Sequence, residues 1–268
     1  DANGAKETKG VALDGHRRLT VSEADRAEFF GGSLAISSDG NTIVVGVDAE
    51  PNKSEGAAYV FDKAASHTQL WPGTETQMLR ASDIRDGDQF GNSVAISDDG
   101  NTIVVGARES TRESTPDVTG VVYVFEKTSE GYSETRLTAS GGDPGGVYGF
   151  GVAVAITGDG KTIVVSAYAH PWGRQSVYMF EKTGAGWPEK ETKKLTTSDE
   201  PTGTFGRSVA ISDNGTVVVG APRARPPGGS LEAKGGVAYM FEKTGAGWPE
   251  AETKKLAAPG VAEIGRAH

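Results

Sequence analysis

Acidic residues are the part of this sequence whose types and spacing come closest to a chemical site. Asp83, Asp86 and Asp88 lie within the segment SDIRDGDQFG. Closely spaced carboxylates of this kind are the ligands that calcium prefers, so the three are candidate calcium ligands. Later copies of the segment, SGGDPGGVYGFG and SDEPTGTFG, carry fewer acids. We therefore expect a solvated, turn-forming loop without a metal or cofactor, and keep calcium as the alternative.

The four histidines do not form a recognisable catalytic set. His16, His67, His170 and His268 are far apart and lie outside the repeated segments described below. The sequence also lacks the metalloprotease, serine-hydrolase and phosphate-loop motifs, in which such residues recur at fixed spacings. We therefore expect a protein that is not an enzyme.

One segment, YAHPWGR, combines side chains that suit recognition: Tyr168, His170, Trp172 and Arg174. Exposed aromatic rings and arginine dominate many interfaces, and aromatic rings stack on sugars. This segment is the candidate ligand-binding loop. The simpler alternative is that Trp172 packs over a sheet edge. Two further tryptophans recur in the phrase GWPE, and a repeated position of this kind indicates a structural role.

Composition narrows the classes of protein further. The 268 residues carry a formal net charge of -9, and the Lys and Arg residues are scattered, so we expect no nucleic-acid partner. No apolar run approaches the roughly 20 residues that cross a bilayer, so we expect no membrane span. The absence of cysteine excludes disulfides and thiolate chemistry. The chain begins at Asp1, without methionine, which fits either a processed chain or a fragment.

A repeated framework of short strands must position these residues. Copies of one phrase begin at Phe30, Phe90, Phe150 and Phe205, and the second reads FGNSVAISDDGNTIVVGA. The alternation in SVAIS predicts a strand with two different faces, and the β-branched run TIVVGA predicts a strand covered on both faces. Segments such as VYVF and TRLT predict a third and a fourth strand. The Asp-Gly or Asn-Gly pair between the first two strands predicts a type I′ hairpin turn.

A four-stranded antiparallel meander repeated at this period is typical of a propeller blade, whose core is completed by its neighbours. The sequence therefore predicts one all-β domain, a β-propeller of about four full blades with partial strands at both ends. Tyrosine and phenylalanine in the third strand are expected to fill the gap between sheets. A small residue in the first strand, at Ala35, Ala95, Ala155 and Ala210, predicts a strand crowded against a central axis. The predicted divisions are an N-terminal segment with a lone outer strand at 1–29, blades at 30–89, 90–149, 150–204 and 205–258, and the start of a truncated fifth repeat at 259–268.

The phrase F-G-x-S-V-A-I-S-x-D-G-x-T-I-V-V-G-A, followed by V-Y-V-F, resembles the FG-GAP repeat family, whose members form the integrin α-subunit propeller and occur in many microbial and algal surface proteins. The resemblance covers nearly all of residues 30–258 and implies the propeller architecture. Many blades of that family bind calcium in a D-x-D-x-D-G-x-x-D loop, but the loops here, such as SDDGNT and TGDGKT, carry only one or two carboxylates. We therefore do not expect that site.

The family resemblance leaves closure of the propeller open, because integrin-like propellers have seven blades. Three arrangements remain: a fragment of a larger propeller, a small ring closed by the N-terminal strand, or an open stack of blades completed by other chains.

Loop positions predict where a partner binds. The variable loops 48–55, 108–119, 168–174 and 222–234 are expected on one face, and loops on a rigid scaffold commonly carry recognition. With the resemblance, this face predicts a non-enzymatic binding or scaffold module that contacts a protein partner or forms a homo-assembly at a cell surface or outside the cell. The alternatives are a lectin-like propeller that binds carbohydrate through the YAHPWGR loop, and a hydrolase or lyase with an axial site.

Overall fold

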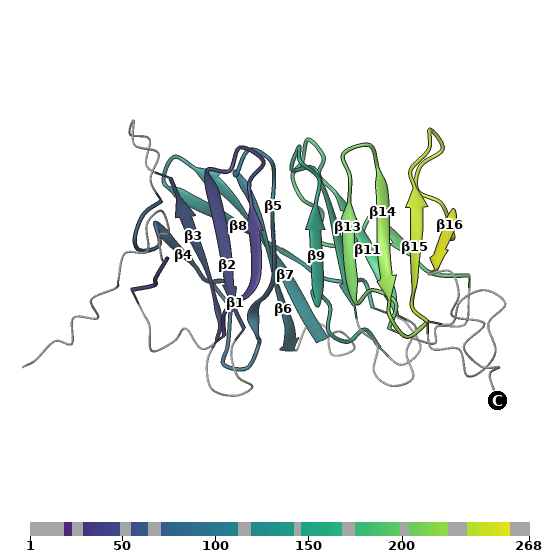
Figure 1. The fold of residues 1–268 in the computed structure, drawn as a ribbon, viewed down its shortest axis with the longest axis horizontal. Coiled ribbons are helices and arrows are strands. Elements are labelled where there is room, and N and C mark those ends of the chain that lie inside the picture. Colours follow the sequence, from purple (N-terminus) through teal and green to yellow (C-terminus); the bar gives the residue numbers. More distant parts are fainter. Residues whose placement is uncertain are drawn as a thin grey trace, which may run out of the picture.

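The computed structural model (Figure 1) describes residues 19–22, 29–48, 55–63, 71–111, 119–141, 146–167, 175–198, 204–224 and 235–257. The regular elements of these segments are the strands β1 (Phe30–Ile36), β2 (Thr42–Val47), β3 (Ala57–Asp62), β4 (Gln77–Leu79), β5 (Phe90–Ile96), β6 (Thr102–Thr111), β7 (Thr119–Thr128), β8 (Gly131–Leu137), β9 (Ala153–Ile156), β10 (Thr162–Ala167), β11 (Ser176–Glu181), β12 (Lys193–Leu195), β13 (Ser208–Ile211), β14 (Thr216–Ala221), β15 (Val237–Glu242) and β16 (Lys254–Ala257). Within these segments the structure contains no helix that is long and apolar enough to cross a membrane.

The strands form four separate antiparallel sheets, each a meander in chain order: β1-β2-β3-β4, β5-β6-β7-β8, β9-β10-β11-β12 and β13-β14-β15-β16. Each sheet is one copy of the sequence repeat. In the second sheet, for example, Val104 of β6 pairs with Ala95 of β5 on one side and with Val124 of β7 on the other. The predicted all-β architecture of four-stranded antiparallel blades is therefore confirmed.

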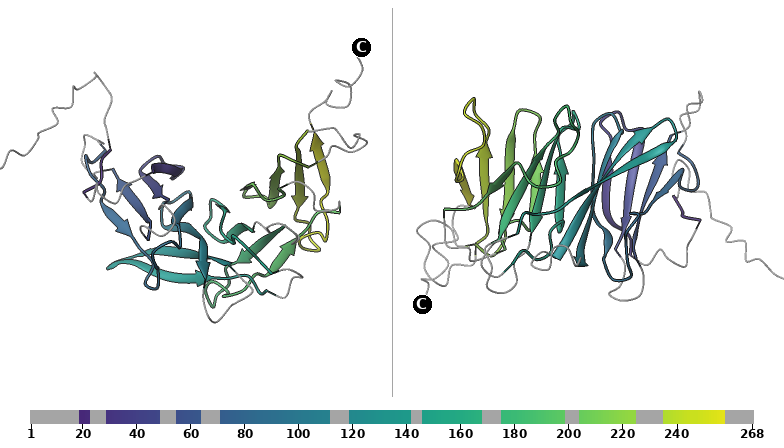
Figure 2. Two further views of the ribbon diagram at one scale, coloured as in Figure 1. Left: turned by 90° about the horizontal axis from the view of Figure 1, so that it is seen from below. Right: turned by 180° about the vertical axis from the view of Figure 1, so that it is seen from behind.

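The blades stand side by side in an open arc (Figure 2). The first strands β1, β5, β9 and β13 line its concave side, where each contacts the next. The fourth strands lie toward the convex side. Over the described residues the sheets do not close into a ring.

Aromatic side chains fill the boundaries between blades, as predicted. Phe90 packs against Tyr123 and Phe125 of its own blade, with ring centroids 5.7 and 6.0 Å away. This triad is buried against Val60 and Leu79 of the first blade. The triads of the third and fourth blades, which are built in the same way, are Phe150–Tyr178–Phe180 and Phe205–Tyr239–Phe241. Burial of large rings makes these boundaries a main source of stability.

The alanines of the first strands lie on the innermost strands, at the boundaries with neighbouring blades. Ala95 is buried against Ile163 and Val165 of the third blade, and Ala35 packs against the second blade. Ala210, in the last described blade, is exposed. The predicted crowding of the innermost strands is therefore found on the concave side, where neighbouring first strands approach each other.

The Phe-Gly pair brings the backbones of neighbouring blades together. Gly91 has a φ of +90°, and the pairing of β5 with β6 shifts register just after Phe90. A Cβ added to Gly106 would lie 2.2 Å from the carbonyl oxygen of Gly151 in the next blade. The hydroxyl of Ser93 donates to that same carbonyl at 2.7 Å. Glycine is therefore required at the point of closest approach.

The hairpin between the first two strands is not the predicted type I′ turn. That turn needs positive φ at both central residues, but only the glycine of each Asp-Gly or Asn-Gly pair has it, for example +64° at Gly40. The N–H of Gly40 donates to the carbonyl of Ser37 at 2.9 Å, and the Ser37 hydroxyl donates to Asp39 Oδ1 at 2.6 Å. The aspartate is a turn former through this hydrogen bond, and the glycine supplies the left-handed conformation.

A serine that follows the fourth strand of one blade is bound by a glutamate of the next blade. Ser82, Ser140 and Ser198 each donate a backbone N–H and a hydroxyl to the carboxylate of Glu134, Glu191 and Glu252, respectively. The N-terminal segment makes the same contact, since Ser22 donates to Glu75 and Thr20 forms an isolated bridge with Thr74. Residues 19–22 therefore hold, relative to the first blade, the position that the end of a fourth strand holds elsewhere.

Candidate ligand-binding groove

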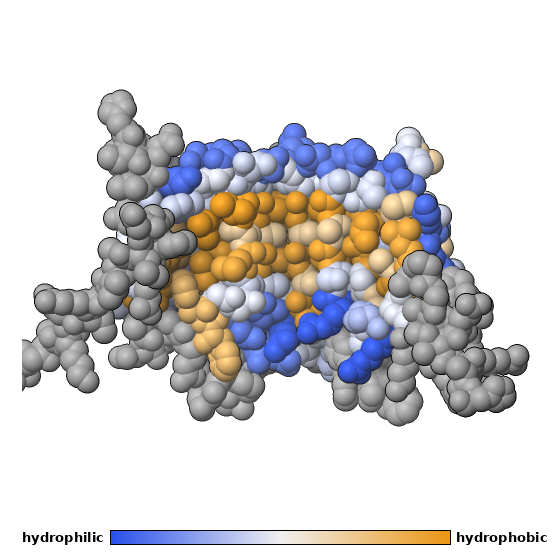
Figure 3. All heavy atoms as spheres, viewed as in Figure 1, coloured by the Kyte–Doolittle hydropathy of each residue, from blue (hydrophilic) through white to orange (hydrophobic). Residues whose placement is uncertain are grey.

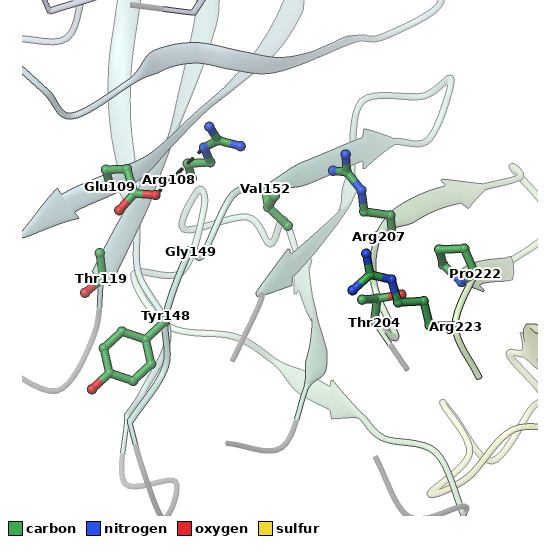
Figure 4. Close-up of a pocket in the computed structure, with 10 residues that line it drawn as sticks. All are labelled: Arg108, Glu109, Thr119, Tyr148, Gly149, Val152, Thr204, Arg207, Pro222 and Arg223. Atoms are coloured by element: carbon green, nitrogen blue, oxygen red, sulfur yellow. Dashed lines mark ion pairs between the residues drawn. The ribbon is translucent and has the colours of Figure 1, made fainter. Parts of the chain in front are cut away.

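A groove of about 900 Å³ opens on the face of the arc opposite the Asp-Gly hairpins (Figure 4). The lining residues are Arg108, Glu109, Thr119, Tyr148, Gly149, Val152, Thr204, Arg207, Pro222 and Arg223. They come from the second, third and fourth blades, where second strands end, third strands begin and the chain enters first strands. The variable loops were predicted to lie on this face, and here they line one groove together with the segments that enter the first strands.

Arg108 is held in place by polar neighbours. Its Nε donates to Gln89 Oε1 at 2.5 Å, and its Nη2 lies 3.6 Å from Asp48 Oδ2 of the first blade. Glu109 is 3.9 Å away and more than half exposed. These contacts orient the guanidinium without enclosing it, because the Arg108 side chain remains 33% exposed.

The carboxyl group of Asp48 is a partly buried counter-ion of Arg108. Burial raises its pKa above the usual value, and the nearby Arg108 guanidinium only partly opposes that shift. Among the described residues its Oδ1 has no hydrogen-bond partner. The Asp48 side chain is 31% exposed and pairs with Arg108 through the other oxygen, while the Arg108 guanidinium stays accessible to a second anion.

Two further arginines stand at the other end of the groove. Arg207 precedes β13 and Arg223 follows β14, and both line this end of the groove, with Arg223 beside Thr204 in Figure 4. Both side chains belong to exposed residues. Within the described segments neither guanidinium has an acidic partner. Two cations without an acidic partner among the described residues are a local concentration of positive charge on a chain whose net charge is -9.

The space between the two cationic ends is less polar. Val152 lies between Arg108 and Arg207 in Figure 4, and Gly149 presents only backbone. Tyr148 lines the same wall and is 42% exposed. The groove thus combines cationic ends, an apolar middle and one exposed aromatic ring, and its described lining residues include one carboxylate, that of Glu109.

The three aspartates considered as calcium ligands take separate roles. Asp83 Oδ1 accepts the Tyr123 hydroxyl at 2.5 Å, and its Oδ2 accepts Arg136 Nη1 at 3.3 Å. Asp88 is buried, and its Oδ2 accepts the backbone N–H of Arg85 at 3.0 Å. Asp86 is exposed. Among the described residues no group of three or more potential metal ligands converges.

The predicted recognition loop, with Tyr168, His170, Trp172 and Arg174, lies outside the described residues. The repeated tryptophans are placed, and they are structural. Trp187 and Trp248 pack against blade boundaries. The ammonium group of Lys182 lies 5.8 Å from the ring of Trp187, and that of Lys243 lies 5.5 Å from Trp248.

Sequence reasoning placed two of the groove's arginines on the binding face and missed the third. Arg108 and Arg223 lie in the variable loops 108–119 and 222–234, which were expected on that face, although neither was singled out. Arg207 lies inside a repeated phrase, at a position where the other copies have Gly32, Asn92 and Val152, and this difference was the signal that could have found it. Only the stacking of three blades brings them to one surface.

Comparison with known proteins identifies the repeat. A family model described as the FG-GAP repeat matches residues 14–61, 74–125 and 190–241, more than half of the chain. No curated protein matches the chain.

Solved structures resemble the chain in the arrangement of their backbone. Hydrazine synthase from Kuenenia stuttgartiensis superposes with a TM-score of 0.52 at 16% identity, covering 93% of this chain and 53% of that one. A proposed 6-phosphogluconolactonase from Bacteroides fragilis superposes with a TM-score of 0.48 at 16% identity, covering 84% of this chain and 54% of that one. The chain thus spans about half the length of these structures. At 16% identity the likeness to hydrazine synthase is one of fold alone.

Proposed function

The chain belongs to the FG-GAP repeat family, and on that premise we propose that it is a non-enzymatic β-propeller module that binds a protein partner through its loop-bearing face. The observation that carries the proposal is the groove with the two guanidinium groups of Arg207 and Arg223, which have no acidic partner within the described segments. Exposed arginine and tyrosine side chains on a rigid scaffold are typical of protein recognition sites.

The concave side supports a non-enzymatic role. A continuous apolar band crosses it (Figure 3), and its first strands contribute aliphatic side chains that pack at or near the blade boundaries, among them Ile96, Val154, Ile156, Val209 and Ile211. Catalysis at an axial site requires polar side chains that converge there. The described first strands place aliphatic groups at that position instead.

The exposed face of the first blade supports contact with another polypeptide. Leu34 and Ile36 are 65% and 58% exposed, although Val94, the counterpart of Leu34 in the second blade, is 9% exposed at a blade boundary. Large apolar side chains grouped on a surface mark sites of protein contact. A protein partner or a second copy of the chain fits this surface, and a setting at the cell surface or outside the cell fits the module.

A paired screen tests the proposal against the carbohydrate-binding alternative. The purified chain is panned against a phage-displayed peptide library and applied in parallel to a glycan array. We expect selected peptides whose binding is lost in the Arg207→Ala/Arg223→Ala variant and kept in Arg85→Ala, which removes an exposed arginine outside the groove. Glycan binding without any selected peptide would overturn the proposal and favour the lectin-like function.

A further inference from the structure

The groove has the charge and shape to select one class of ligand. We propose that it binds an acidic peptide segment, with one carboxylate at Arg108 and a second at Arg207 and Arg223. This inference rests on the proposed function and deepens it by naming the chemistry of the partner. It concerns only described residues of the second, third and fourth blades.

The charge of the groove favours an anionic ligand. Three arginines and one glutamate line the groove, so the local balance is positive although the whole chain is strongly acidic. Guanidinium groups bind carboxylates through two parallel hydrogen bonds, which is a stronger and more directional contact than that of a lysine. An anionic ligand supplies the partners that Arg207 and Arg223 lack within the described segments.

The fixed orientation of the Arg108 side chain also favours binding of a carboxylate. Gln89 holds its Nε, while its Nη2 faces a carboxylate whose pKa is raised by burial. Because the side chain is already oriented, a ligand that binds it loses little side-chain entropy at this position. A ligand carboxylate at Arg108 adds a further counter-ion to those supplied by Asp48 and Glu109.

The apolar middle distinguishes a peptide from an anionic sugar chain. Val152 and the backbone of Gly149 separate the two cationic ends (Figure 4). A peptide places acidic side chains at intervals along a backbone that includes neutral residues, so its acids meet the arginines while a neutral residue crosses Val152. Sugar sites are commonly built on aromatic platforms, but the one aromatic residue here, Tyr148, stands on a wall to one side.

The test uses fluorescein-labelled synthetic peptides in which two aspartates are separated by one to four glycines, with matched peptides that carry asparagine instead. Binding is followed by fluorescence polarisation. We expect at least one aspartate peptide to bind about tenfold more tightly than its asparagine match, and its affinity to fall as salt is raised. Equal binding of the two series would overturn the inference.

Variants locate the site. Arg207→Ala/Arg223→Ala is expected to weaken the aspartate peptide about tenfold or more, and Arg207→Lys to weaken it several-fold, because lysine keeps the charge and loses the paired hydrogen bonds. Arg85→Ala serves as the matched control and keeps wild-type affinity. An equal loss in Arg85→Ala would show that binding follows net charge, and would also overturn the inference.

Two further outcomes separate this inference from the proposed function. If the selected peptides are neutral, compete for the groove and show no preference for aspartate, the proposed binding function stands. The inference that the ligand is acidic would then be refuted. Tight binding of a polygalacturonate oligosaccharide with no binding of any peptide would refute both.

Discussion

Ser82 and Glu134 join the first and second blades through two hydrogen bonds of equal length. The backbone N–H of Ser82 donates to Glu134 Oε2 at 2.9 Å, and its hydroxyl donates to Oε1 at 2.9 Å. Both carboxylate oxygens are therefore bound by one residue of the neighbouring blade. The same pairing recurs at every described blade boundary, so it is part of the repeat and acts between units.

Glu134→Ala is expected to lower the free energy of unfolding by about 1 kcal/mol, because it removes two charge-assisted hydrogen bonds at an exposed site. The measurement is urea unfolding followed by tryptophan fluorescence. Glu130→Ala, which removes an exposed glutamate from the β7–β8 turn, is the control and should change stability by less than about 0.5 kcal/mol. An equal loss in both variants would contradict a specific role for the contact.

The aspartates of the hairpins predict acid sensitivity. The pKa values of Asp39, Asp99 and Asp159 are lowered, first of all by the hydroxyl of Ser37, Ser97 or Thr157 that donates to each carboxylate. Because the folded pKa lies below the unfolded one, these groups stabilise the fold above about pH 4 and lose that contribution as the pH falls through the folded value.

The fourth hairpin supplies a natural control for this effect. Its Asn214 accepts the Ser212 hydroxyl at 2.5 Å without a carboxylate. We expect the Asp39→Asn/Asp99→Asn/Asp159→Asn variant to lose less stability than the wild type between about pH 4 and pH 2 in circular-dichroism melts. A variant whose melting temperature falls as steeply as that of the wild type would show that these carboxylates do not set the acid limit.

Sequence reasoning found the fold because the repeat carries its own strand signals. Alternation in SVAIS, the β-branched run TIVVGA and the aromatic VYVF each specify a strand by local pattern, and four copies agree. The type of hairpin turn was predicted wrongly because Asp-Gly fits both a type I′ turn and a turn in which only the glycine has a positive φ. The serine two positions before Asp39 decides between them, since its hydroxyl binds the carboxylate while the φ of that aspartate stays negative.

The candidate site was only half predictable from sequence. Strand order places the loops on one face, and the groove lies there. Which side chains line the groove depends on how far each blade is rotated from the next. This rotation brings Arg108 of the second blade into the same groove as Arg207 and Arg223 of the fourth. Nothing local to a single arginine encodes that rotation, because it arises from the packing of aromatic triads and small residues at the boundaries.

The residue before each Phe-Gly pair is left-handed in every blade. Phe29, Gln89, Gly149 and Thr204 have φ values between 58° and 65°, a region that costs a non-glycine residue about 1 kcal/mol. Phe29→Gly is therefore expected to raise the free energy of unfolding by up to about 1 kcal/mol, the more readily because the ring is 61% exposed. Gly149→Ala should lower the free energy of unfolding by a similar amount. A loss of stability in Phe29→Gly would show that the left-handed backbone at Phe29 is not strained.

The close approach at Gly106 gives the sharpest test of how blades are joined. An alanine Cβ there would lie 2.2 Å from the Gly151 carbonyl oxygen and 2.4 Å from Ser93 Oγ, so the second and third blades must move apart. We expect Gly106→Ala to cost about 1–3 kcal/mol, as overpacking of a tight contact does. Gly184→Ala, where a Cβ meets nothing within 4 Å, should be neutral within about 0.5 kcal/mol. The stability of both variants is measured by urea unfolding. A neutral Gly106→Ala would show that the second and third blades are not in close contact at this position.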